Sequence, residues 1–111
     1  MNARVVLRPQ VPDDLHAIVQ YLEQHSGTVV ANRFADNVFA TLDGLAAHPG
    51  RGSPKQLRSR QLVGVRTCAV AGFRNHLIFY RHEADAVVVL AVVHGSRNVR
   101  ALLLDRLRPP G

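Results

Sequence analysis

The chain has 111 residues, of which 47% are hydrophobic and 20% charged, and it contains one cysteine. This length fits a single domain over residues 1–111, and the apolar fraction excludes disorder of the whole chain. One cysteine excludes an internal disulfide and a zinc site built on paired cysteines. No apolar run reaches the roughly 18 residues of a membrane span, and the N-terminus lacks a signal-peptide pattern. We therefore expect a cytoplasmic domain that does not contact a membrane.

The charge is unevenly distributed along the chain. Fourteen basic residues against eight acidic ones give a net charge of +6. No acidic residue lies between Asp43 and Glu83, although that stretch is rich in cations. A surface that only contacts solvent normally mixes both signs, so this half of the chain predicts an acidic partner, either nucleic acid or an acidic protein segment. We expect three of its cations, Arg66, Arg74 and Arg81, to form one positive surface. The cations of the stretch are Arg51, Lys55, Arg58, Arg60, Arg66, Arg74 and Arg81.

The first half of the sequence predicts one strand and two helices. Residues 3–8 are β-branched and aliphatic and predict a short strand. Pro12 followed by two aspartates is typical of a helix start, and an apolar stripe from Leu15 to Leu22 then follows helical spacing over about 12 residues. A longer helix begins near Thr28 and ends before His48, and its apolar stripe consists of Phe34, Val38, Leu42 and Leu45. Two amphipathic helices joined by a short link form an antiparallel hairpin, which needs an apolar surface to cover.

The second half predicts a loop, three strands and a short helix. Residues 50–61 are polar and basic and contain glycine and proline, as loops do. Strands are expected over residues 62–71, 74–82 and 86–93, the last buried on both faces, and a short helix over residues 98–107. The fold class is therefore α+β, with β-αα-βββ order and an antiparallel sheet packed against the helical hairpin.

The candidate chemistry is limited by what the chain lacks. The six histidines are scattered without metal-ligand spacing, so no metal and no cofactor are expected. What remains is metal-free acid–base cleavage of a phosphodiester, or no catalysis at all. Each of the candidate histidines is as well explained by a structural role, and His94 in particular by capping the turn after its strand. The candidate cations are Arg66, Arg81 and Arg97, and the candidate bases are His76, His82 and His94.

Residues 64–81 and the segment after them resemble the ParE/RelE toxin family of type II toxin–antitoxin systems, and the resemblance extends over about residues 3–105. The family pattern is an arginine-to-Gly-Phe segment, an Arg-Asn-His-x-Ile-x-Tyr-Arg segment, and a hydrophobic strand that ends in Val-x-His-Gly-x-Arg. The matching residues are Arg66, Val70, Gly72, Phe73, Arg74, Asn75, His76, Ile78, Tyr80, Arg81, Val92, His94, Gly95 and Arg97.

The resemblance implies one of two activities. RelE-like members cut mRNA on the ribosome and carry a tyrosine shortly after the last strand, whereas ParE-like members are linked to inhibition of DNA gyrase. This chain has no tyrosine after Tyr80, which favours the ParE-like branch, without catalysis and with a role in plasmid stabilisation. The alternative is a ribosome-dependent mRNA endonuclease that uses Arg66, Arg81, His94 and Arg97. A third possibility is a nucleic-acid-binding module without toxicity.

The resemblance also implies partners. We expect a cognate antitoxin, DNA gyrase as the target, and contact with operator DNA only through the antitoxin. The residues expected to contact target or antitoxin are Arg66, Arg74, His76, Tyr80, Arg81, Arg97 and Arg100.

Overall fold

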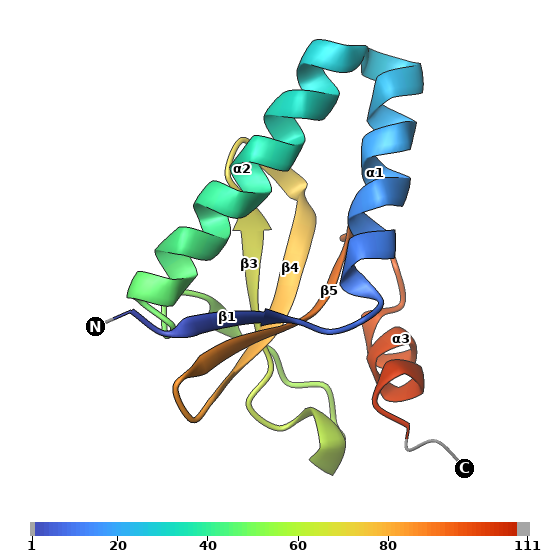
Figure 1. The fold of residues 1–111 in the computed structure, drawn as a ribbon. Helices are drawn as coiled ribbons and strands as arrows, with labels where there is room; N and C mark the ends of the chain where they lie inside the picture. Colours follow the sequence, from blue (N-terminus) through green and yellow to red (C-terminus); the bar gives the residue numbers. More distant parts are fainter. Residues whose placement is uncertain (1, 109–111) are drawn as a thin grey trace.

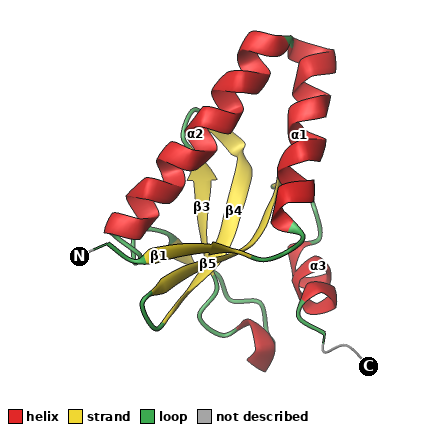
Figure 2. Ribbon diagram, in the orientation of Figure 1, coloured by secondary structure: helices red, strands yellow, loops and turns green. Residues whose placement is uncertain are grey.

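The computed structural model describes residues 2–108, which form a five-stranded sheet with helices on both faces (Figure 1). The α1–α2 hairpin covers one face of the sheet, and its two helices diverge from their junction towards the sheet (Figure 2). α3 packs on the opposite face. None of the described helices is long and apolar enough to cross a membrane. The elements are β1 (Arg4–Leu7), α1 (Val11–Ser26), α2 (Thr28–Ala47), β2 (Ser53–Pro54), η1 (Arg60–Leu62), β3 (Arg66–Val70), β4 (Phe73–Glu83), β5 (Ala86–His94) and α3 (Val99–Arg106).

The sheet has the strand order β1-β5-β4-β3-β2 and is mixed. β3, β4 and β5 form the expected antiparallel meander, but β1 pairs with β5 in parallel, with Arg4 opposite Ala86 and Leu7 opposite Val89. The predicted α+β class is confirmed, but the sheet is mixed rather than antiparallel because β1 joins it in parallel. No tight turn joins β1 to β5, and the long connection through the helical hairpin allows parallel pairing, which local sequence does not reveal.

The helical hairpin packs on the sheet through the expected apolar stripes. α1 is longer than predicted, at 16 residues, and a single residue, Gly27, links it to α2. Gly27 has a φ of 88°, which glycine adopts without steric cost. Phe34, Val38 and Leu42 of α2 are buried against the sheet, which confirms the predicted core face.

The opposite face of the sheet has its own hydrophobic core. Leu62 and Val65, which the sequence assigns to a strand, lie instead in and after η1 and pack with Phe79, Leu90 and Leu103. The predicted strand over residues 62–71 therefore begins only at Arg66. β5 lies between the two cores and is buried along nearly its whole length, as the sequence predicts.

An ion pair joins the two layers at the point where β1 ends. Arg106 of α3 donates from both terminal nitrogens to the Asp14 carboxylate of α1, one of these bonds measuring 2.7 Å, and both side chains are nearly buried. Asp14 also accepts a 3.1 Å bond from the Val92 backbone N–H, and Arg106 donates to the Leu90 carbonyl. Pairing of β1 with β5 ends at Val89, and Leu90 has no direct partner on β4. The Asp14 and Arg106 side chains therefore satisfy backbone groups of β5 that neither neighbouring strand pairs with.

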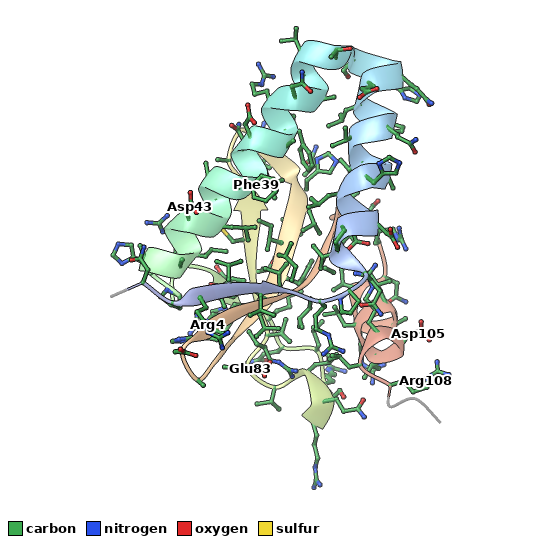
Figure 3. All side chains as sticks on the ribbon, in the orientation of Figure 1. Arg4, Phe39, Asp43, Glu83, Asp105 and Arg108 are labelled. Atoms are coloured by element: carbon green, nitrogen blue, oxygen red, sulfur yellow. The ribbon has the colours of Figure 1, made fainter. Side chains whose placement is uncertain are left out.

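Two phenylalanines of α2 provide a matched test of the packing. Phe34 is fully buried and meets the Phe73 ring edge-on at 5.1 Å, whereas Phe39 is 55% exposed and is labelled on α2 in Figure 3. Phe34→Ala should lower the free energy of unfolding by about 3–5 kcal/mol, because it leaves a cavity in the core. Phe39→Ala should change it by no more than about 0.5 kcal/mol. Urea unfolding of both variants measures the difference, and equal losses would contradict the assigned packing.

Candidate functional site

A groove of about 710 Å³ lies between α1 and the adjoining ends of β4 and β5. Its floor is apolar, its rim carries two arginines, and two histidines lie between them. This combination of apolar contact area with a few directed polar groups is typical of binding sites. The lining residues are Asp14, Ala17, Ile18, Tyr21, Gly72, Phe73, Arg74, Asn75, His76, Val92, Val93, His94 and Arg97.

The two histidines of the groove contact each other. His76 of β4 is directly opposite His94 of β5 in the antiparallel register, so both side chains leave the same face of the sheet. Their rings meet edge-on with centroids 5.4 Å apart, and the His76 ring also lies 5.2 Å from that of Phe34. Burial, and secondarily the neighbouring His94, lower the pKa of His76 below its ordinary value of 6.5.

His94 has the structural contact that its position predicts. Its Nδ1 accepts a 3.1 Å hydrogen bond from the Ser96 backbone N–H and lies 2.8 Å from the Ser96 hydroxyl. This bond holds the turn that follows β5 and fixes the orientation of the ring. The capping role is therefore confirmed, and it leaves Nε2 as the ring nitrogen without this contact.

The rim of the groove carries positive charge. Arg74 and Arg97 form no ion pair within residues 2–108, and Asp14, the acidic residue of the groove, is already bound by Arg106. Tyr21 adds an aromatic ring that is 58% exposed and stacks on His25 with centroids 4.0 Å apart. The groove can therefore take a segment with both apolar and acidic groups.

Of the residues predicted to contact a target or antitoxin, the groove contains only three, Arg74, His76 and Arg97, together with His94 of the candidate catalytic set. Arg66 points elsewhere and donates to the Gly52 carbonyl at 2.6 Å and the Gly50 carbonyl at 3.3 Å. Arg66 lies opposite Tyr80, and Arg81, as the next residue of β4, leaves the other face of the sheet. Our expectation that Arg66, Arg74 and Arg81 form one positive surface was therefore wrong.

The other residues predicted to contact a partner form hydrogen bonds within the domain. Arg81 donates to the Gln61 carbonyl at 2.6 Å and pairs with Glu83 at 3.1 Å, and Arg100 donates to the Leu57 carbonyl at 2.8 Å. Tyr80 is completely buried, and its hydroxyl donates to the Pro49 carbonyl and accepts from the Gly52 N–H. Tyr80 thus fastens the loop after α2 to the sheet, and burial raises its pKa.

Sequence reasoning missed Tyr21, Asn75 and Asp14 as groove residues. Tyr21 falls beside the apolar stripe of α1, so an exposed aromatic at that position was the available signal. Asp14 was assigned only to the helix start, because nothing local indicates its contact with Arg106, 92 positions later. Within residues 2–108, no three His, Cys, Asp or Glu side chains are grouped so that they could hold a metal ion.

The fold is that of a small α+β domain, and it carries a basic, partly apolar groove. A family model described as the ParE toxin of the type II toxin–antitoxin system parDE matches residues 5–99. Toxin ParE1 of Caulobacter vibrioides is 38% identical over 91 residues, which cover 81% of this chain and 86% of that protein. The chain therefore belongs to the ParE toxin family of type II toxin–antitoxin systems.

The fold agrees with this membership. A solved structure described as the chromosomal ParDE TA system from P. aeruginosa matches with a TM-score of 0.67 at 16% identity. The match covers 83% of this chain and 95% of the other.

The lowered pKa of His76 predicts a pH dependence of stability. Between the lowered pKa of folded His76 and the ordinary value of 6.5, the unfolded chain binds a proton at this position more readily than the folded chain does. The stability contributed by neutral His76 is therefore fully present above about pH 6.5 and is lost as the pH falls through its folded pKa. The melting temperature of His76→Gln should fall less than that of wild type between neutral and acidic pH. His16→Gln, on the exposed side of α1, is the matched control, and parallel curves for wild type and His76→Gln would contradict this assignment.

Proposed function

We propose that this toxin arrests growth by inhibiting DNA gyrase and that a cognate antitoxin neutralises it by covering the groove between α1, β4 and β5. Membership of the ParE family supports this proposal. The rim arginines Arg74 and Arg97 and the exposed ring of Tyr21 give the groove the positive charge and apolar area that a protein partner needs. A cytoplasmic location and a role in plasmid stabilisation belong to the same proposal.

The toxin is proposed to act without catalysis of its own. The observation that supports this proposal is the separation of the candidate catalytic residues. Cleavage of RNA requires a base, an acid and cations within hydrogen-bond reach of one phosphate. Arg66 lies opposite position 80 of β4 and His94 opposite position 76, which places them at least about 14 Å apart along the sheet. β3 and β5 also flank β4 on opposite sides, which lengthens the separation. Only His94 and Arg97 of the endonuclease set share the groove.

The chemistry of the groove also describes the antitoxin segment that would fill it. The floor residues Ile18, Phe73 and Val92 offer apolar contact area, and the rim offers two guanidinium groups. A segment that alternates apolar and acidic side chains, and folds only on binding, satisfies both. We propose that the antitoxin makes the sequence-specific contacts of the complex with operator DNA.

The proposal is tested with purified gyrase and relaxed plasmid. Wild-type toxin should inhibit supercoiling, and the double variant Arg74→Gln, Arg97→Gln should be about tenfold weaker, which corresponds to about 1.4 kcal/mol of lost binding. Arg4→Gln is the control, because Arg4 is an exposed cation whose partner is Asp85 and which lies outside the groove. Both variants should melt within a few degrees of wild type.

The same protein should be added to translating ribosomes, with mRNA ends mapped by primer extension. Intact mRNA together with inhibited supercoiling is the expected result. Discrete ribosome-dependent cuts with normal gyrase activity would overturn the proposal in favour of the endonuclease that uses Arg66, Arg81, His94 and Arg97.

A further inference from the structure

A second positive surface lies away from the groove, on the segment between β2 and β3. We call residues 55–62 the basic loop. Lys55, Arg58 and Arg60 of the basic loop are all exposed, as is Arg100 of α3. None of these four side chains forms an ion pair within the described chain.

The basic loop is held rigidly by groups other than its exposed cations. Arg100 donates to the Leu57 carbonyl at 2.8 Å and to the Arg58 carbonyl at 3.4 Å, and Arg81 donates to the Gln61 carbonyl at 2.6 Å. Leu62 is buried in the core under α3. Side-chain bonds and an apolar anchor thus hold the backbone of the loop, and with it the positions from which its cations extend into solvent.

Arg58 shows that this arrangement is imposed by the surrounding structure. Its φ is 52°, in the left-handed region that side chains other than glycine, asparagine and aspartate seldom adopt. The two bonds from Arg100 to adjacent carbonyls hold the chain in this conformation. Strain of this kind is retained where the surroundings over-determine the backbone, and it is frequent at binding sites.

Neighbouring acidic groups do not cancel the charge of the basic loop. The acidic residues on the strand and helix packed against it are Glu83 of β4 and Asp105 of α3. Glu83 is paired with Arg81, and Asp105 is paired with Arg108, at the end of α3 labelled in Figure 3. The potential over the basic loop therefore stays positive, and it attracts anions.

We propose that Lys55, Arg58 and Arg60 of the basic loop bind the phosphate backbone of duplex DNA directly. Lysine and arginine interleaved with the neutral donors Gln56, Ser59 and Gln61 are the side chains that contact DNA phosphates. This surface is separate from the groove, so the inference does not depend on gyrase being the target.

Two features of the sequence favour duplex DNA over other acidic partners. No aromatic residue occurs in residues 51–66 or 97–108, whereas proteins that bind single strands stack the bases on aromatic side chains. An acidic protein partner would need apolar contact area, and the large apolar side chain exposed on this segment is Val63, at 72%.

The test is fluorescence anisotropy of a short labelled DNA duplex of arbitrary sequence, titrated with the full chain over a series of salt concentrations. Three phosphate contacts should give a slope of log affinity against log salt of about −3, at about −0.9 per contact. The triple variant Lys55→Gln, Arg58→Gln, Arg60→Gln should bring the slope close to zero. The charge-matched control Arg4→Gln, Arg33→Gln, Arg51→Gln should keep the wild-type slope, because its residues are exposed and lie outside both the basic loop and the groove. Circular dichroism of each variant checks that it is folded.

Three results would overturn the inference. They are a loop variant that binds duplex DNA like wild type, tighter binding of single strands or duplex RNA than of duplex DNA, and binding of poly-glutamate with the same dependence on the loop. The supercoiling assay tests the proposed function separately. A loop variant that has lost DNA affinity but still inhibits gyrase leaves the proposed function intact. Conversely, wild-type toxin that binds duplex DNA without inhibiting gyrase refutes the proposed function alone.

Discussion

The carboxylate of Asp14 is the contact on which the arrangement of the molecule depends. It accepts hydrogen bonds from Arg106 of α3 and from the backbone of Val92 in β5, while Asp14 itself belongs to α1. It therefore ties a helix on one face of the sheet to a helix on the other, at the position where β1 stops pairing with β5. A nearly buried charge pair is stable only when both partners remain, so loss of either side chain leaves an unpaired charge in the interior.

The alternation of side chains along β4 divides the positive charge between the two faces of the sheet. Adjacent residues of a strand face opposite sides, so His76 enters the groove under α1 while Arg81 supports the loop on the other side. A chain region that is uniformly basic in sequence thus becomes two surfaces in space, a mixed apolar groove and a polar, cationic loop. The groove has the composition of a protein-binding site and the loop that of a phosphate-binding site.

Local patterns in the sequence were sufficient to predict the helices and the antiparallel meander. The stripe that contains Phe34 and Val38 and the apolar run of β5 each predict an element from its own residues, because burial follows helical or strand periodicity. The parallel pairing of β1, the Asp14–Arg106 contact and the burial of Leu62 and Val65 under α3 depend on residues far apart in the chain. For the same reason the sequence identified the histidines and arginines of the groove but grouped them with Arg66, Tyr80 and Arg81, which the fold directs elsewhere.

Native-state hydrogen exchange tests most directly whether the two layers are one unit held by Asp14. In wild type, the amides of Val92 in β5 and Leu103 in α3 should exchange with the free energy of global unfolding, because neither can open alone. In Asp14→Asn, both free energies should fall together with the global value. If Leu103 in wild type exchanges with a free energy well below that of Val92, α3 opens independently and the account of a single cooperative unit is contradicted.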